Sequence, residues 1–483
     1  MKYHIVIIFE IIVNIIKLFC IIKIIFNYGL FFGSSIIFFI LTFYYFIIEY
    51  LFNIEYLSFD KTLLGFSNRD QYTINLVLCL NGDFNEENIK SRIINNMIKK
   101  IPKLQSKIVY IYFNYYWKKF PINDKMLKET IQIIELNSKL NLEEFLQNEV
   151  NKRLDTLNDY PYKINIIKFS QPTIDSNCTG CIHLKCDHVL SDGLGILSLL
   201  MCLADDFNTD FYPKVFKNKK PLTFLMELRD TILFPFYLIY AFYVVFFNSS
   251  FDKTEYKLFY NYHHDGETHF KMTEWYDIDI IKKIRNKYKV SFNSAAVGLF
   301  LKSEKDVLQN INSLNIVLPV GYTLIPKKIE EIQLKNLARG FLLNLPLIDN
   351  LDKLPELHKN IISNLSNTSI TYLPIFFYKI LSQLFILKIL NFLANNIIIN
   401  VDMLISNVPG PEIPIKICNC ILTDFYPVVS TGRMKAFIMI TSFCKKFRYV
   451  ISFDKSVGYD INELTNALSN NINNVDKNCK KKF

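Results

Sequence analysis

Apolar side chains dominate the first fifty residues of the chain. Residues 30–48 carry no charged side chain, and this run is long enough to cross a bilayer, which takes about 20 residues. We expect it to form a transmembrane helix. Residues 4–26 are also apolar but include Glu10, Lys17 and Lys23, so this stretch either spans the membrane or lies flat on its surface. A cleaved signal peptide is the alternative, and the absence of a short apolar segment with a small-residue cleavage site argues against it.

The number of membrane spans decides on which side the rest of the chain lies. If only residues 30–48 span, the lysines before them favour a cytosolic N-terminus and place the remainder across the membrane. If residues 4–26 and 30–48 form a hairpin, the remainder stays in the cytosol. A third apolar run, residues 231–247, contains Pro235 and is at the lower limit of spanning length. We expect it to lie in or on the membrane, with a buried helix between domains as the alternative.

The rest of the chain alternates between strand and helix patterns, which predicts an α/β fold. Residues 72–80 form a predicted strand with one buried face, which ends at an Asn81-Gly82 turn, and residues 86–104 have helical periodicity. Alternation over residues 182–186 predicts another strand, and a helix is expected over residues 195–202. Residues 435–442 and 447–453 are typical of a hairpin.

Composition narrows the class of protein. Hydrophobic residues make up 51% of the 483 positions, which excludes a disordered chain. The net charge of +10 comes from 55 basic and 45 acidic residues without a long basic block, and this favours an anionic membrane surface over nucleic acid. The ten cysteines are irregularly spaced, which indicates free thiols in a reducing compartment.

The segment CDHVLSDGLG, residues 186–195, carries the main candidate chemistry. It runs from a predicted strand through a turn into a helix. His188 shares the parity of Ile182, Leu184 and Cys186, so we expect its side chain on the buried side, where a neutral imidazole can accept a proton. Asp192 is a candidate for orienting the turn. An isolated His near an Asp and a Gly also occurs for purely structural reasons.

Two further local patterns are candidates for a functional role. SNVPGP, residues 406–411, predicts a rigid Pro/Gly loop that presents groups from a scaffold, or else an ordinary turn. A cluster of cysteines and histidines matches zinc ligands by number alone, but strand alternation points its members in opposite directions, so we predict no metal site. The members are Cys178, Cys181, His183, Cys186 and His188.

HxxxDG at residues 188–193, together with SNVPGP at residues 406–411, resembles the wax ester synthase/diacylglycerol acyltransferase family. This family belongs to the HxxxD acyltransferases, which include chloramphenicol acetyltransferase. The resemblance covers residues 57–468 and includes LNGDFN (80–85), PKLQSKIV (102–109), LPV (318–320), NLARGFLLNLPL (336–347) and FYPV (425–428). It implies two chloramphenicol acetyltransferase-like α/β domains related by a pseudo-two-fold axis, which meet at a tunnel around the histidine.

The resemblance also implies roles for individual residues. His188 would be the general base that deprotonates an alcohol as its oxygen attacks an acyl thioester. Asp192 would hold the turn through an ion pair with an unidentified arginine, and Gly193 and Asn407 would support the site. An Asn-Asp pair is common in the family, and here Asn293 is followed by serine. A second departure is Asp187, which stands where members usually have a first histidine.

We therefore expect a membrane anchor (1–52), an acyltransferase domain with HxxxDG (53–225), an apolar linker (226–262), a second domain with SNVPGP (263–475) and a solvated, disordered basic tail (476–483). The predicted activity is transfer of a long-chain acyl group from acyl-CoA, the co-substrate, to a fatty alcohol or diacylglycerol, with no bound cofactor. Because acyl-CoA is cytosolic, we expect catalytic domains on the cytosolic face of a membrane, that of the endoplasmic reticulum.

Two alternatives belong to other classes. A catalytically degenerate relative that binds membrane lipid or a partner would explain Asp187 and the serine after Asn293, but it has little reason to keep His188, Asp192 and Asn407. A multi-spanning transporter is disfavoured because residues 52–230 contain no run of spanning length.

Overall fold

The computed structural model describes residues 47–57, 72–111, 114–138, 140–170, 178–212, 266–321, 325–367, 401–458 and 460–480, and the single residues 23 and 43. Nearly all of residues 4–26 and 30–48, and all of 231–247, lie outside these ranges, so the membrane segments stay a prediction. Within the described ranges, no helix combines the length and the hydropathy needed to cross a membrane.

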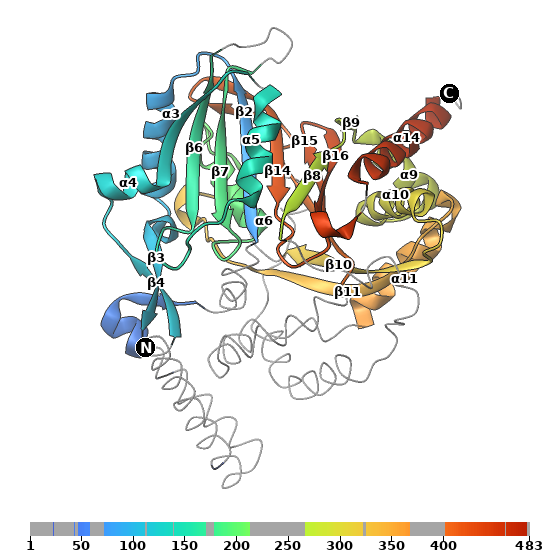
Figure 1. Ribbon diagram of the computed structural model, residues 1–483, viewed down its shortest axis with the longest axis horizontal. Helices are drawn as coiled ribbons and strands as arrows, with labels where there is room; N and C mark the ends of the chain where they lie inside the picture. Colours follow the sequence, from blue (N-terminus) through green and yellow to red (C-terminus); the bar gives the residue numbers. More distant parts are fainter. Residues whose placement is uncertain are drawn as a thin grey trace.

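Four strands from the first half of the chain and two from the second build a mixed six-stranded sheet, called the first sheet (Figure 1). Helix α5 (Leu140–Asn151) covers one of its faces, where the Phe145 ring meets the His183 ring edge-on at 5.4 Å between centroids. The strands, in spatial order, are β13 (Lys416–Ile417), β14 (Cys420–Val429), β2 (Thr73–Asn81), β7 (Gly180–Asp187), β6 (Tyr162–Phe169) and β5 (Ile131–Leu136). The α-helices of the first half are α3 (Glu86–Arg92), α4 (Asp124–Thr130), α5 (Leu140–Asn151) and α6 (Gly193–Met201).

A small three-stranded sheet adjoins the first half. It consists of β1 (Ile54–Tyr56), β4 (Asn114–Lys119) and β3 (Ser106–Ile111), all antiparallel. Ile48, Ile54 and Tyr116 form its own buried cluster. The segment that leaves the predicted anchor therefore joins the folded part of the chain through this sheet.

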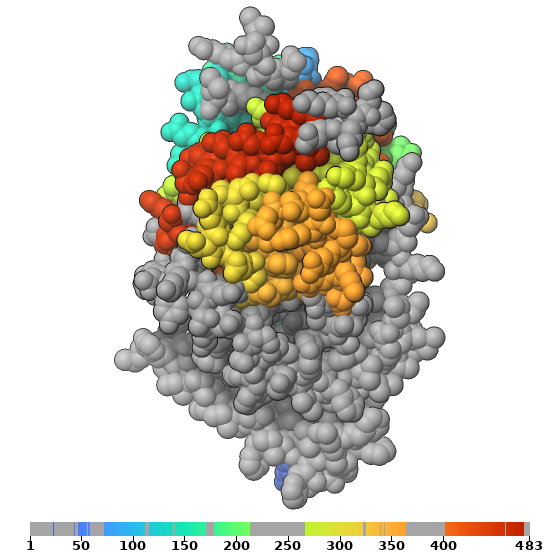
Figure 2. All heavy atoms as spheres, turned by 90° about the vertical axis from the view of Figure 1, so that its right-hand side faces the viewer, coloured from blue at the N-terminus to red at the C-terminus, as the bar shows by residue number. Residues whose placement is uncertain are grey.

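The second half builds a seven-stranded sheet covered by helices on one face. Figure 2 shows α14 (red) and α11 (orange) on this outer surface. The strand order is β11 (Ala338–Pro346), β10 (Ser313–Gly321), β12 (Met403–Pro409), β15 (Ala436–Phe443), β16 (Lys446–Asp454) and β8 (Thr268–Met272), with β9 (Tyr276–Asp277) also paired to β16. The helices are α9 (Asp279–Tyr288), α10 (Phe292–Val307), α11 (Leu354–Asn367) and α14 (Ile461–Lys480).

Strand β15 shows how the second sheet joins two cores. Ile438 and Ile440 are buried in the cluster that contains the outer helices. Phe437 and Met439, on the opposite face because side chains alternate along a strand, belong to the cluster of the first half. The second sheet is therefore sandwiched between its own helices and the first half of the chain.

Strand β14 comes from the second half of the chain but belongs to the first sheet. It lies between β12 and β15 in sequence, yet it pairs antiparallel with β2 in the first sheet (Figure 1). Its Asp424 accepts hydrogen bonds from Arg448 Nη2 (2.7 Å) and Trp275 Nε1 (2.9 Å). The Arg448 guanidinium is buried and lies 3.9 Å from the Trp275 ring centroid. The ion pair of Asp424 with Arg448, together with the contact between Arg448 and the Trp275 ring, fixes β14 to the second half of the chain.

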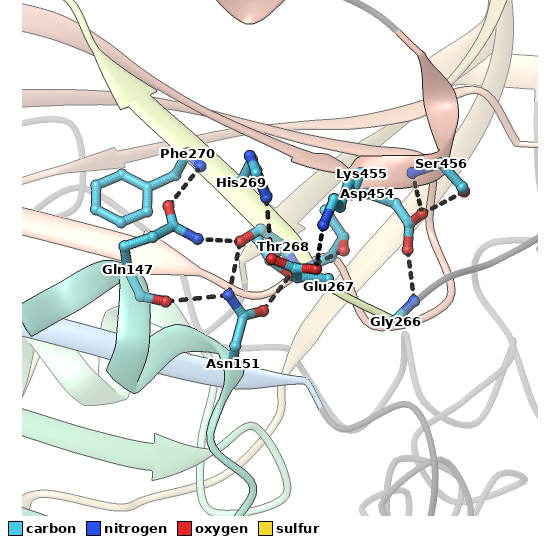
Figure 3. A network of polar contacts seen from close by, with 11 residues as sticks. Gln147, Asn151, Gly266, Glu267, Thr268, His269, Phe270, Asp454, Lys455 and Ser456 are labelled. Atoms are coloured by element: carbon cyan, nitrogen blue, oxygen red, sulfur yellow. Dashed lines mark hydrogen bonds and ion pairs between the residues drawn. The ribbon is translucent and has the colours of Figure 1, made fainter. Parts of the chain in front are cut away.

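Helix α5 also ties the two halves together, because its side chains cover the edge of β8 (Figure 3). Thr268 N donates to Asn151 Oδ1 at 2.7 Å, and Gln147 Nε2 donates to Thr268 O at 2.5 Å. Phe270 N donates to Gln147 Oε1 at 3.4 Å. The side chains of Gln147 and Asn151 thus form hydrogen bonds with the backbone of β8 that a further neighbouring strand would otherwise make, so the polar groups at this sheet edge are satisfied.

Several predicted elements are confirmed. β2 and β7 match the predicted strands, and α6 begins two residues before the predicted start. The predicted hairpin is β15–β16, whose turn residues Cys444 and Lys445 have φ values of 46° and 65°. Positive φ at both positions matches the twist of a two-residue hairpin.

Other expectations were wrong in ways that packing explains. β2 is buried on both faces, because its side chains belong to the core of the first sheet and α5 packs against it. The predicted helix over residues 86–104 ends earlier, as a π-helical turn over Ile93–Ile98, because Pro102 requires an extended residue before it.

The C-terminal tail was expected to be disordered from residue 476, but α14 continues through this part of the tail to Lys480. Leu464, Leu468 and Ile472 lie four residues apart on one face of α14, and this face is buried. The α/β fold is confirmed, whereas the pseudo-two-fold relation stays a prediction.

Candidate active site

His188 is the first residue after β7. Its backbone N–H donates to Tyr72 O at 2.8 Å, which continues the β2–β7 pairing by one residue. A tight turn follows, in which Leu190 N donates to Asp187 O, and α6 begins at Gly193. The His188 side chain is half-buried. The strand end, the tight turn and the start of α6 therefore hold the imidazole where it is neither fully buried nor freely solvated.

One ring nitrogen of His188 is held from the other half of the chain. His188 Nδ1 is 3.0 Å from Asn336 Oδ1, in the segment that connects β10 to β11. The Asn336 amide nitrogen donates to His188 O (2.9 Å) and Val189 O (3.3 Å). Within the described part of the chain, Nε2 of His188 makes no hydrogen bond. The imidazole is thus anchored through one nitrogen and presents the other.

Asp192 organises the turn after His188. It is the N-cap of α6, where Oδ1 accepts from Gly195 N at 3.1 Å. Its Oδ2 accepts from Leu337 N at 2.9 Å, next to Asn336 in sequence. These two hydrogen bonds come from backbone amides, one of them at a helix N-terminus, where a carboxylate is favourable, and the ion pair with an arginine that the resemblance implies stays a prediction. Asp192 therefore joins α6 to the β10–β11 connection.

Gly193 allows the halves to approach closely. A Cβ atom at this position would lie 3.0 Å from Val408 Cγ2 of β12. Such a distance is tighter than an ordinary van der Waals contact, so a larger residue would push α6 away from β12. Gly193 thus permits close contact between α6 and the SNVPGP strand.

Asn407 and Asn293 lie together, but away from His188. Asn407 Nδ2 donates to Asn293 Oδ1 of α10 at 2.6 Å. Its neighbour Val408 faces Gly193, and because side chains alternate along β12, Asn407 points to the opposite face. Within the described residues, no hydrogen bond joins Asn407 to His188. The expectation of a loop at residues 406–411 was wrong for Ser406–Pro409, which form the end of β12, because they pair with β15.

Both departures from the family pattern have structural partners. Asp187 Oδ1 accepts from Val189 N at 2.9 Å and Oδ2 accepts from Thr156 Oγ1 at 2.7 Å. Ser294 Oγ lies 2.9 Å from His358 Nδ1 of α11. Asp187 therefore stabilises the turn after β7, and Ser294 links α10 to α11.

A second polar group lies behind the site, on the face of β7 covered by α5. His183 is fully buried between Asn75 Oδ1 and Asn165 Nδ2, each 3.1 Å from a ring nitrogen. Burial lowers the pKa of His183 to about 3, so this ring is neutral. Burial also lowers the pKa of Lys185 to about 8, although Glu149 opposes this shift. The sequence pattern did not predict that these polar residues are buried.

Asn336 is the residue that sequence reasoning missed. It lies within the segment NLARGFLLNLPL that carried part of the resemblance, but nothing local marks it as a partner of a residue 148 positions away. In the described ranges, no group of three or more His, Cys, Asp or Glu residues is arranged to hold a metal ion.

Solved structures with this fold include an acyltransferase and several condensation domains. The wax ester synthase/diacylglycerol acyltransferase from Marinobacter aquaeolei VT8 superposes with a TM-score of 0.56 at 14% identity, covering 87% of this chain and 98% of that one. The first condensation domain of the CDA synthetase gives 0.58 at 9% identity, over 86% and 94% of the two chains. The starter condensation domain of rhizomide synthetase, in complex with C8-CoA and Leu-SNAC, gives 0.56 at 9%, over 87% and 93%. At these identities the likeness shows the fold alone.

The sequence itself identifies the family of one region. Residues 341–476 match the family described as WS/DGAT C-terminal domain. This match confirms the resemblance to the wax ester synthase/diacylglycerol acyltransferase family over that region. Comparison with curated proteins gives no match.

Proposed function

We propose that this protein is a membrane-associated O-acyltransferase that transfers a long-chain acyl group from acyl-CoA to a fatty alcohol or diacylglycerol. His188 is the general base in this proposal. The observation that carries it is the imidazole at the end of β7, anchored through Nδ1 and with Nε2 unbonded among the described residues. A half-buried imidazole of this kind can take a proton at neutral pH.

In the proposed reaction His188 first accepts a proton as a base and then donates it as an acid. Nε2 of His188 accepts the hydroxyl proton as the alcohol oxygen bonds to the thioester carbonyl carbon. The tetrahedral intermediate then collapses, the C–S bond breaks, and Nε2–H returns the proton to the departing sulfur. The products are an ester and free coenzyme A, and no acyl-enzyme forms. Asp192 and Gly193 support the turn around this base, whereas Asn293 and Asn407 pair with each other away from it.

Membrane association is supported by sequence and by the nature of the acceptors. Residues 30–48 and 231–247 are apolar runs near spanning length, and both proposed acceptors partition into bilayers. A site beside the membrane raises the local concentration of such acceptors. The cytosolic face of the endoplasmic reticulum suits a protein that draws on cytosolic acyl-CoA.

A catalytically degenerate, lipid-binding relative is the second candidate, because Asp187 and Ser294 depart from the family pattern. Both residues have hydrogen-bond partners that account for them structurally. The departures therefore give little support to a loss of activity.

The test is an acyl-transfer assay on membranes that contain the full chain. Labelled palmitoyl-CoA is offered with hexadecanol and diolein together, beside the His188→Ala and His269→Ala proteins. His269 is exposed on β8 and pairs with Glu267, so it serves as the matched histidine control. We expect product from the wild type and the His269→Ala protein only, and the ratio of wax ester to triacylglycerol identifies the acceptor. No product from folded wild-type protein, across several chain lengths and acceptors, would favour the lipid-binding alternative.

A further inference from the structure

The contact between His188 and Asn336 does more than fix a ring in place. Asn336 is 8% exposed and lies in the connection between β10 and β11, whereas His188 follows β7. The two side chains meet at 3.0 Å, between Nδ1 and Oδ1. A buried amide that reaches across the halves to one ring nitrogen can select the protonation state of that nitrogen.

The hydrogen bonds of Asn336 determine which way its amide faces. Its other amide atom is 2.9 Å from His188 O and 3.3 Å from Val189 O. Both partners are backbone carbonyls, which only accept, so the atom that faces them must be the NH₂ group. Oδ1 therefore faces the imidazole. Because an amide oxygen only accepts, Nδ1 of His188 must carry the proton.

The backbone on each side of Asn336 is held by the turn that follows His188. Leu337 N donates to Asp192 Oδ2 at 2.9 Å, and Ser191 Oγ donates to Lys335 O at 3.3 Å. Lys103 Nζ donates to Leu334 O at 2.7 Å from a third segment. The amide is thus fixed in position before any substrate binds.

We propose that Asn336 is a positioning residue that holds the neutral His188 in the tautomer protonated at Nδ1, which leaves the Nε2 lone pair for the acceptor hydroxyl. Asp192 contributes by holding the backbone next to Asn336. In free histidine the tautomer protonated at Nε2 predominates, and it has no lone pair at the position the reaction needs. The catalytic consequence of this assignment rests on the proposed function, but the tautomer itself does not.

Nitrogen NMR tests the tautomer without any turnover. The full chain, labelled with ¹⁵N-histidine, is measured in nanodiscs at a pH where the imidazoles are neutral. The chain has seven histidines, and the signals lost in the His188→Ala protein identify those of His188. We expect a protonated Nδ1 and an unprotonated Nε2 in the wild type, and a shift towards the Nε2-protonated form in the Asn336→Leu protein. Asn344→Leu is the control, because this residue lies on the adjoining β11 and its amide donates to Asn315.

Kinetics then test the consequence. Asn336→Leu should lower kcat about 10–100-fold, the size seen when a residue that orients a metal-ligating histidine through its second ring nitrogen is removed, with little change in KM for acyl-CoA. Asn336→Asp keeps an acceptor for Nδ1–H and adds a negative charge beside the imidazole, which stabilises the imidazolium. Its kcat/KM profile should therefore shift its acid limb to higher pH, whereas Asn344→Leu should leave both rate and profile unchanged.

The outcomes separate this inference from the proposed function. A wild-type His188 protonated at Nε2 would overturn the inference, as would an Asn336→Leu protein with unchanged tautomer and kcat. If that variant does not fold, the wild-type spectrum and the pH profile of Asn336→Asp decide. A wild type with the expected tautomer but no acyl transfer to any acceptor would contradict the proposed function and leave the tautomer assignment intact.

Discussion

Two histidines five positions apart on β7 show how one strand supports two different environments. His183, in the middle of the strand, is fully buried and has an amide on each ring nitrogen. His188, just beyond the end, is half-buried and has an amide on one. Both positions suit a neutral imidazole, but only His188 has a nitrogen left to accept a proton. The comparison teaches that a histidine with both ring nitrogens held by amides has no nitrogen left for a ligand, whereas one held through a single nitrogen keeps the other open.

The largest expected effect is the loss of turnover when His188, just beyond the end of β7, is replaced. His188→Ala should lower kcat about 10²–10⁴-fold, the range for loss of a general base, while the unfolding temperature stays near that of the wild type. Single-turnover acyl transfer and thermal unfolding of the same preparation measure the two quantities. A folded His188→Ala protein with wild-type kcat would exclude His188 as the base.

The next largest effect is a loss of protein stability when His183, in the middle of β7, is replaced. His183→Leu leaves Asn75 and Asn165 without their ring partner, and each such loss costs about 1–3 kcal/mol of unfolding free energy. The kcat of the protein that remains folded should stay close to wild type. Denaturant unfolding beside the transfer assay tests this, and a loss of kcat equal to that of His188→Ala would remove the distinction between the two sites.

The pH dependence of the same variant sharpens the comparison. Because the pKa of buried His183 is about 3, the unfolded chain, with a pKa near 6.5, binds more protons between these values. The contribution of His183 to stability is therefore full above about pH 6.5 and falls on acidification by up to about 1.4 kcal/mol per pH unit. We expect the stability difference between wild type and His183→Leu to shrink from about pH 7 to about pH 5. A difference that grows on acidification would contradict the assignment.

A smaller effect is expected at Asp187, which lies between the two histidines. Asp187→Ala removes the acceptor for Val189 N and Thr156 Oγ1, at a cost of about 1–3 kcal/mol in unfolding free energy. Because the turn then loosens, kcat should fall several-fold, well short of the loss in His188→Ala. Wild-type stability in the Asp187→Ala protein would show that the turn does not depend on this carboxylate.

The smallest effect belongs to the pair in the second half. Asn407→Ala breaks one hydrogen bond to Asn293 and should cost about 1 kcal/mol of stability without changing KM or kcat appreciably. Asn293→Ala should match it, and the double variant should add little, because both remove the same bond. A large loss of kcat in Asn407→Ala alone would instead place its side chain at the substrate.

Local structure around the candidate base could be predicted from the sequence. Alternation over residues 182–186 predicted β7, the Gly-containing turn predicted the start of α6, and HxxxDG with SNVPGP pointed to the family that the match over residues 341–476 supports. The loop expected at SNVPGP failed because a Pro and a Gly near a strand end do not reveal whether a neighbouring strand will pair with it.

The sequence by itself determined the features that depend on near neighbours. Strand alternation, the Asp192 cap of α6 and the two-residue turn at Cys444 and Lys445 all arise from contacts a few positions apart. Only the tertiary structure decided that β14 joins the first sheet, that β7 is buried on both faces, and that Asn336 meets His188. These features depend on how two sheets pack and on segments more than a hundred residues apart, and periodicity in a sequence records which face of an element is apolar but not which distant element will cover it.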